Sequence, residues 1–482
     1  MLFNSWTFAA FIVIVLPIYY SLSRRGQNLF LLVASYVFYG WWDWRFLGLL
    51  WVSTVVDYAV ALSLDKTTSP GRRRGLISIS LFTNLGMLGF FKYFDFFVTS
   101  AIDALSTLGI PASPPLLEVV LPVGISFYSF QTLSYALDVY RRDQPACRSF
   151  VDFALFVAYL PQLVAGPIER ATRLLPQIQA DRRVGQREWA TGLQLILWGY
   201  VKKVAIADSL ARYADAAFTN PAGCDALTLL LCVYAFAIQI YCDFSGYSDI
   251  ARGISRLMGI ELMENFRQPY LSRNITEFWR RWHISLSTWL RDYLYIPLGG
   301  NRGGPFAQYK NIMITMLLGG LWHGANWTFV IWGGLHGIFL AVHKFYLRKR
   351  KVSFEPVPIG VGPWLNYAAG VFVTFHLVCL TWVFFRAPDL DSALAYNALL
   401  INNSAAVSSA LATPDFLGLW EALFFYGLVI FALDFRCWRR ASELPFTEED
   451  AWWRRGIAYA AGMLILMLVR ENSSGAFIYF QF

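Results

Sequence analysis

Residues 319–326 read Gly-Gly-Leu-Trp-His-Gly-Ala-Asn, and they place His323 between two apolar runs, 309–322 and 326–345. About 20 consecutive apolar residues are long enough to cross a bilayer as a helix. The chain has only five histidines, and none precedes His283. A charged side chain at membrane depth costs roughly 2.5–3.5 kcal/mol on insertion scales, so an ionisable residue there is a functional candidate. The alternative is a neutral histidine that only packs.

The composition indicates a polytopic membrane protein. Of the 482 residues, 57% are hydrophobic and 15% are charged, whereas soluble domains carry about 25% charged residues. The apolar stretch 6–20 lacks a basic start and a small-residue cleavage site, so we expect a retained first span rather than a signal peptide. Six scattered cysteines without a CxxC pair argue against a zinc site or a disulfide framework.

Apolar runs recur along the whole chain, and we expect about eleven spanning helices in one membrane domain, residues 1–482. Further segments are expected to enter the membrane without crossing it, where protein or a water-filled cavity shields their backbone. Loops are expected at 94–118, 401–413 and 434–455. The candidate runs are 6–22, 28–40, 46–64, 76–93, 119–139, 150–166, 189–211, 226–242, 309–322, 326–345, 366–386, 414–433 and 456–470.

The basic residues predict the orientation. They cluster after the first, third and fifth runs, whereas 94–118 contains none. Because basic loops face the cytoplasm, the N-terminus is predicted to lie on the extracytoplasmic side. The net charge of +8 therefore reflects topology and does not indicate nucleic-acid binding.

Residues 274–296 do not resemble a lipid-facing helix. Apolar residues recur every three or four positions, which predicts a helix, and Asn274 with Glu277 resembles a capping box. Five charged residues in this segment make lipid exposure implausible. We expect an oblique or in-plane helix with an aromatic face, and His283 on it either lines a reaction site or only packs. The glycine-rich stretch 299–304 is expected to be a loop.

Three other segments carry polar residues inside apolar runs. In 239–253, Asp243 and Asp249 flank Ser245 and Gly246. This pattern suggests a broken helix that either positions substrate or forms a structural polar network, with Arg252 as one candidate partner for the carboxylates. The small and hydroxyl residues of 122–142 favour helix–helix packing. Two prolines and a glycine in 161–170 suit a re-entrant turn.

His283 and His323 remain as candidates for chemistry, since the chain has no GxSxG, P-loop or HExxH motif. An imidazole with a pKa near 6.5 can accept a hydroxyl proton at neutral pH. His336 is 13 residues from His323, about 20 Å along one straight helix, so His283 is the better partner. The candidate substrate-binding residues around the two histidines are Trp282, Trp322, Asn326, Asp243 and Ser245.

Several segments together resemble the membrane-bound O-acyltransferase family, in its bacterial alginate O-acetyltransferase branch. The most specific are Phe-Trp-Arg-Arg-Trp-His-Ile-Ser-Leu-Ser-Thr-Trp-Leu-Arg-Asp at 278–292 and Leu-Trp-His-Gly at 321–324. Supporting segments lie at 35–42, 121–131, 161–168 and 241–249, and Trp382 to Arg386 match a late family segment without an assignable role. The resemblance covers nearly the whole chain.

The resemblance implies an all-α fold, a ring of tilted helices around a tunnel, with a catalytic core at about 119–345. The essential histidine of the family matches His323, and the second polar member of its site matches His283. The implied activity is transfer of an acetyl group from a cytoplasmic donor, acetyl-CoA, toward an extracytoplasmic polysaccharide such as alginate. No permanently bound cofactor and no metal are expected.

The resemblance also implies a partner, an extracytoplasmic SGNH-type acetyltransferase-like protein in a bacterial inner-membrane system. D-alanyl transfer to teichoic acid from a carrier-protein thioester is the nearest alternative. An alternative of another class is a transporter or flippase that uses Asp243 and Asp249 as its path.

Overall fold

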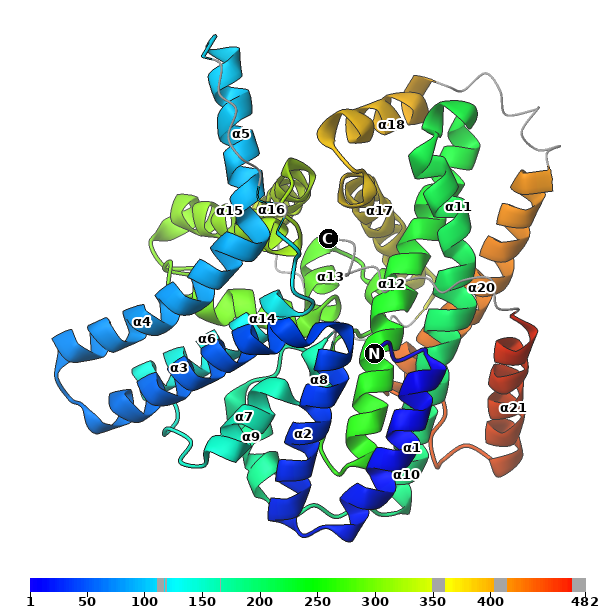
Figure 1. Ribbon diagram of the computed structural model, residues 1–482. Helices are drawn as coiled ribbons and strands as arrows, with labels where there is room; N and C mark the ends of the chain where they lie inside the picture. The colour runs from blue at the N-terminus through cyan, green and yellow to red at the C-terminus, as the bar shows by residue number, and fades with distance from the viewer. Residues whose placement is uncertain (111–116, 118, 165, 349–359, 403–413, 470–482) are drawn as a thin grey trace. The chain divides into compact units, whose positions relative to one another are not determined.

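The computed structural model describes residues 1–110, 117, 119–164, 166–348, 360–402 and 414–469, and within them every regular element is helical (Figure 1). The all-helical class predicted from the sequence is therefore confirmed. The expected loop 401–413 lies outside the described residues except for 401 and 402, which end a helix.

Six helical stretches in the described part of the chain are long and apolar enough to cross a membrane. They are Arg24–Lys66, Pro70–Thr107, Ala226–Leu257, Trp327–Leu347, Val361–Arg386 and Leu417–Arg440. A shorter apolar helix, Trp6–Ser21, precedes them. The chain is thus a multi-pass membrane protein, and the expected number of eleven spans stays a prediction.

The chain divides into two compact units. The first comprises Met1–Leu193 and Ile250–Met263, and the second comprises Gln194–Asp249 and Glu264–Phe482. The first unit holds α1 (Trp6–Ser21), α2 (Arg24–Asp43), η1 (Trp44–Phe46), α3 (Leu47–Lys66), α4 (Pro70–Leu88), η2 (Gly89–Tyr93), α5 (Phe94–Thr107), α6 (Ile125–Arg141), α7 (Phe150–Ala158), α8 (Leu160–Leu163) and α9 (Ala171–Gln179).

Two helices, α10 (Gln186–Tyr200) and α12 (Ala226–Leu257), contribute residues to both units. The second unit holds η3 (Val201–Ala207), α11 (Asp208–Thr219), η4 (Pro221–Gly223), η5 (Pro269–Leu271), α13 (Ile275–Arg281), α14 (Ile284–Leu290), η6 (Arg291–Tyr295), α15 (Gly304–His323), α16 (Trp327–Arg348), α17 (Val361–Arg386), α18 (Leu390–Asn402), α20 (Pro414–Arg440) and α21 (Trp452–Leu468).

Hydroxyl and amide side chains join α3, α4 and α6 in the first unit. The Ser53 hydroxyl donates to Asn84 Oδ1 at 2.7 Å, Thr132 Oγ1 donates to the same oxygen at 3.1 Å, and Asn84 Nδ2 donates to Asp57 Oδ2 at 2.9 Å. All four side chains are buried. The polar face predicted at 122–142 therefore packs against other helices, as small and hydroxyl residues do in membranes.

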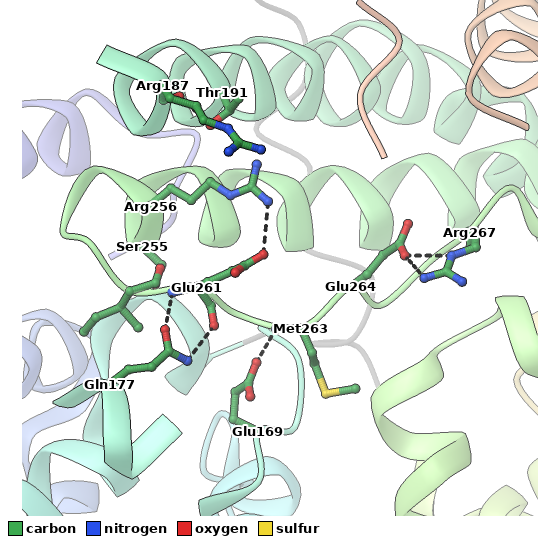
Figure 2. A network of polar contacts seen from close by, with 11 residues as sticks. Glu169, Gln177, Arg187, Thr191, Ser255, Arg256, Glu261, Met263, Glu264 and Arg267 are labelled. Atoms are coloured by element: carbon green, nitrogen blue, oxygen red, sulfur yellow. Dashed lines mark hydrogen bonds and ion pairs between the residues drawn. The ribbon is translucent and has the colours of Figure 1, made fainter. Parts of the chain in front are cut away.

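Polar contacts also fix the segment that follows α12 in the first unit (Figure 2). Gln177 on α9 donates to the Glu261 carbonyl and accepts from the Glu261 N–H, at 3.0 and 2.8 Å. The Met263 N–H donates to the buried Glu169 carboxylate. The 161–170 segment that supplies Glu169 is no continuous span, because α8 ends at Leu163.

Two predicted loops are partly helical. Residues 94–107 form α5, which continues α4 through the π-helical turn η2 (Figure 1). Helix α20 continues to Arg440, so only 441–451 of the expected 434–455 loop connects helices. Asp450 there is buried and pairs with Arg436 and with Arg440 at 2.6 Å. Charge density in the sequence did not distinguish this ion-pair cluster around a buried aspartate from a solvated loop.

The broken helix expected at Ser245 and Gly246 is wrong, because α12 runs without interruption through both. A Cβ atom on Gly246 would lie 2.7 Å from the Gly199 carbonyl oxygen and 3.0 Å from the Lys203 nitrogen. The glycine therefore permits a close approach by the backbones of α10 and η3 and does not break the helix.

Candidate active site

The helix predicted across 274–296 is interrupted at His283. Helix α13 begins at Asn274, whose Oδ1 accepts from the Glu277 N–H at 2.9 Å, which confirms the predicted N-cap. It ends at Arg281, and α14 begins at Ile284. Between them, His283 adopts φ 41° and ψ 56°, a left-handed conformation that is uncommon outside glycine. The periodicity of the apolar residues continues across this break, which is why the sequence did not reveal it.

Asn265 stabilises the break from a distant part of the sequence. The backbone carbonyl oxygen of Asn265 accepts from the Ile284 N–H at 2.9 Å, and its side-chain Oδ1 accepts from the Ser285 N–H at 3.2 Å. The Ser285 hydroxyl donates to the same Oδ1 at 2.9 Å. These bonds satisfy the first backbone donors of α14, which the histidine N-cap does not satisfy itself.

The same amide oxygen determines the tautomer of His283. His283 Nδ1 lies 3.1 Å from Asn265 Oδ1. The Ser285 N–H can only donate, so the atom it contacts is the amide oxygen and not the nitrogen. An amide oxygen only accepts, so Nδ1 carries the proton and Nε2 carries the lone pair of the neutral ring. His283 is thus oriented as an acceptor through Nε2.

Burial keeps His283 neutral. The side chain is fully buried, and burial lowers the pKa of its imidazole to about 3. The Phe244 ring of α12 packs edge-on against it, with ring centroids 4.7 Å apart. Desolvation disfavours the charged imidazolium, so His283 serves as a neutral group at physiological pH.

His323 is the last residue of α15 and faces His283. The two ring centroids are 6.2 Å apart, and the side chain of His323 is 4% exposed. The Trp322 ring lies beside both imidazoles, 5.1 Å from His323 and 6.0 Å from His283. Trp332 and Phe385 pack edge-on against His323, at 5.1 and 5.4 Å. The predicted proximity of the two histidines is confirmed.

Glycines bring α15 and α16 into contact next to His323. A Cβ atom on Gly320 would lie 2.1 Å from the Phe329 carbonyl oxygen, and one on Gly333 would lie 2.2 Å from the Met316 carbonyl oxygen. Only glycine fits at either position. This close approach places Trp332 of α16 against the imidazole that ends α15.

His336 has a structural role. It is fully buried, the Trp279 Nε1–H donates to its Nδ1 at 3.3 Å, and its Nε2 lies 3.0 Å from the Thr381 hydroxyl. Both ring nitrogens are therefore engaged between α13, α16 and α17. This agrees with the expectation that His336 does not form a dyad with His323.

The structure separates the five candidate substrate-binding residues. Trp322 lies beside both histidines, whereas Trp282, which precedes His283 in the chain, packs on Trp382 with centroids 5.0 Å apart. Asn326 acts at the start of α16, where its Oδ1 accepts from the Thr328 N–H at 3.0 Å and its Nδ2 donates to the Pro388 carbonyl. Ser245 is buried on α12 next to Phe244, but no hydrogen bond joins its hydroxyl to either imidazole.

Asp243 belongs to a buried ion-pair network. Its Oδ1 lies 2.6 Å from Lys203 Nζ, which is also 2.8 Å from Asp208 Oδ1. Lys202 pairs with Asp249 at 2.7 Å. The lysines come from η3, where the π-helical turn presents two successive basic side chains to α12. The structural polar network weighed for 239–253 thus has Lys202 and Lys203 as partners, which the sequence pattern did not indicate.

The sequence interpretation missed Asn265, Phe244 and Trp332. No local signal singles out Asn265, because its partners are about 20 residues further along the chain. Trp332 and Phe244 look like ordinary apolar residues of spanning helices. Only packing reveals that they surround the two imidazoles.

Comparisons with known proteins identify the family and similar proteins. The model for the membrane-bound O-acyltransferase family matches residues 36–386, which include both histidines. The chain is 41% identical to the probable alginate O-acetylase AlgI of Pseudomonas putida over the full length of both proteins. It is 33% identical to the peptidoglycan O-acetyltransferase of Helicobacter pylori, over 100% of this chain and 98% of that one. It is 31% identical to the teichoic acid D-alanyltransferase of Streptococcus thermophilus, over 55% of this chain and 68% of the other.

Proposed function

Because the chain belongs to the membrane-bound O-acyltransferase family and is an O-acyltransferase, we propose that it transfers an acetyl group from cytoplasmic acetyl-CoA toward an extracytoplasmic polysaccharide such as alginate. The observation that carries this proposal is the pair of buried imidazoles, 6.2 Å apart, with the tautomer of one fixed by Asn265. D-alanyl transfer has weaker support, because that relative matches only 55% of this chain.

In the proposed reaction, His323 removes the proton from the attacking hydroxyl of the acceptor molecule. The hydroxyl oxygen forms a C–O bond to the thioester carbonyl carbon, the C–S bond breaks, and the proton passes from His323 to the departing thiolate. General-base catalysis of this kind contributes about 10²–10⁴-fold. His283 accepts a hydrogen bond at Nε2 and positions the reacting groups. The aromatic rings of Trp322, Trp332 and Phe385 around His323 exclude water, which would otherwise hydrolyse the thioester.

His323→Ala tests the assignment. We expect acetyl transfer to fall by roughly 10²–10⁴-fold, the general-base contribution, while the purified protein keeps its thermal unfolding midpoint. His283→Ala should reduce activity strongly but less, because water can partly replace a hydrogen-bond acceptor. The matched control is His376→Gln, since His376 lies outside the site and bonds to Tyr234. A folded His323→Ala protein with normal transfer would refute the assignment.

We further propose that an extracytoplasmic SGNH-type acetyltransferase-like partner receives the acetyl group and delivers it to the polymer. Its support is the resemblance described above, together with the short connections between helices in the part of the chain that the structure describes. The proposed location is a bacterial inner membrane with the N-terminus outside. The basic clusters after the first, third and fifth apolar runs support this orientation.

A further inference from the structure

A cavity of about 440 Å³ lies in the second unit between α12, η5, α17 and α20. On α20 it is lined at positions 427, 430, 431, 434, 435 and 438, and on α17 at 364, 367, 368, 371, 372 and 375. Both sets repeat every three or four residues, so each helix turns one face to the cavity. Facing stripes of this kind normally interlock to close packing density. Here they leave a space within the 300–1,000 Å³ range typical of ligand pockets.

The cavity offers almost only apolar surface. Aromatic rings dominate its lining, and the tyrosine hydroxyls there already donate to the protein. Tyr241 donates to Asp434 at 3.0 Å, Tyr270 to the Ala237 carbonyl at 2.6 Å, and Tyr367 to the Leu271 carbonyl at 2.6 Å. A polar ligand would therefore lose its hydration and find few hydrogen-bond partners in return. A hydrocarbon chain has no polar groups and would lose no hydrogen bonds on entering.

The cavity reaches the lipid-facing surface. Its inner residues are buried, and Leu271, Tyr367 and Trp438 form a hydrophobic cluster there. Two lining residues at the other end, Phe372 and Phe431, are 65% and 53% exposed. Both α17 and α20 are candidate membrane spans, so the exposed rings face bilayer hydrocarbon. An apolar cavity that opens toward lipid offers space for a hydrocarbon chain.

We propose that this cavity holds an acyl chain of a bilayer phospholipid, inserted between α17 and α20. Neither histidine lines this cavity, and one of its four walls, α20, lies beyond residue 386, where the family match ends. The donor's pantetheine arm is the rival occupant, but Asp434 is the only charged side chain in this lining, and its Oδ1 already accepts from Tyr241. The chain fills a gap that the side chains of the two helices leave open.

Photo-crosslinking tests the proposal. The purified protein is placed in nanodiscs of phosphatidylethanolamine and phosphatidylglycerol that contain a phospholipid with a diazirine near the end of one acyl chain. After irradiation, adducts are mapped by mass spectrometry. We expect adducts on the cavity residues Tyr367 and Ile430, which are 8% and 6% exposed, as well as on the exposed Phe424.

Gly427→Phe is the decisive variant. A Cβ atom there would make only an ordinary contact, 3.7 Å from Ile238 Cδ1, so the new ring fills the cavity without striking backbone. Adducts on Tyr367 and Ile430 should fall at least fivefold, whereas those on Phe424 should persist. Ala368→Phe should act in the same way from α17. Gly456→Phe on α21, with open space around it, is the control and should change nothing.

Three results would overturn the proposal. If Tyr367 and Ile430 carry no adducts in the wild type, no acyl chain enters the cavity. The same conclusion follows if their adducts are unchanged in both cavity-filling variants. Loss of these adducts on adding acetyl-CoA would assign the cavity to the donor instead.

Discussion

Asn265 explains how a histidine at a backbone break becomes a defined acceptor. One amide group caps α14 and contacts Nδ1 of His283, so local backbone geometry and the protonation pattern of the ring depend on the same atom. A well-defined site needs such a hydrogen-bond partner, because an imidazole without one can switch between its two tautomers.

Asn265→Ala should lower the acetyl-transfer kcat by about 10²-fold, within the range for losing an oriented acid–base group, with a smaller change in the KM for acetyl-CoA. Asn265→Asp keeps an acceptor at Oδ1 and should retain more activity. A carboxylate beside Nδ1 favours the imidazolium, so the pKa of His283, now about 3, should rise. The acid limb of the kcat–pH profile should move to higher pH. An unchanged profile in Asn265→Asp would contradict this positioning role.

Glu169 in the first unit links stability to pH. The side chain is fully buried, and burial raises the pKa of its carboxyl to about 7, against the opposing effects of the Met263 N–H and nearby arginines. The folded state therefore holds a proton that the unfolded chain releases above a pKa of about 4.3. The associated stability is fully present below that pH and is lost as pH rises through about 7.

Glu169→Gln should flatten this dependence. At about 1.4 kcal/mol per pKa unit, the wild type should lose up to about 3 kcal/mol of unfolding free energy between pH 4.5 and 8, and the glutamine variant should not. The measurement is the thermal unfolding midpoint in detergent micelles across that pH range. The control is Glu261→Gln, which removes an exposed carboxylate from the facing segment (Figure 2). Parallel curves for wild type and Glu169→Gln would show that Glu169 is not the group responsible.

At the scale of elements, glycines determine how close the site-bearing helices come. The Gly320 and Gly333 backbones touch in the α15–α16 hairpin, and the Gly246 backbone approaches η3. In a membrane, where helix association gains little from the hydrophobic effect, such close approach is a main source of packing energy.

Gly320→Ala should separate α15 from α16. Its Cβ would lie 2.1 Å from a backbone oxygen that cannot move away as a side chain would. We expect a loss of roughly 1–3 kcal/mol in stability and a decrease in acetyl transfer, because His323 ends the displaced helix. Gly334→Ala is the matched control on α16, with its nearest contact at 3.4 Å to the end of a leucine side chain. Equal behaviour of the two variants in unfolding and activity assays would disprove the packing argument.

At the scale of the whole molecule, the described residues are mostly helical, and the connections among them are short. Within the residues that the structure describes, no stretch between helices exceeds 11 residues, as in 441–451. A folded domain needs about 50 residues. The described residues therefore contain no separate module that could grip and position a long glycan.

Reconstitution tests the proposed relay. With the protein in liposomes, acetyl-CoA on the cytoplasmic side and polysaccharide outside, we expect little acetylation of the polymer. Addition of the SGNH-type partner should allow acetylation of the polymer, and the His323→Ala variant should not support it even with the partner. Full acetylation of the polymer by this chain alone would show that it holds the glycan itself.

The sequence by itself determined the membrane class and the helical fold, and it singled out His283 and His323 as the candidates for chemistry. These properties are local: apolar runs have a length that matches the bilayer, and a rare imidazole within them stands out whatever its neighbours are. The Asn274 cap was predicted for the same reason, because its partner is three residues away.

Only the tertiary structure decided what surrounds the histidines. The break at His283 is stabilised by Asn265, Asp243 is paired with Lys203, and Gly246 serves a backbone contact inside a continuous helix. Each depends on residues about 20 or more positions apart that meet through packing. A sequence pattern records which side chains share a helix face, but the energy of these contacts arises between elements, where the pattern carries no information.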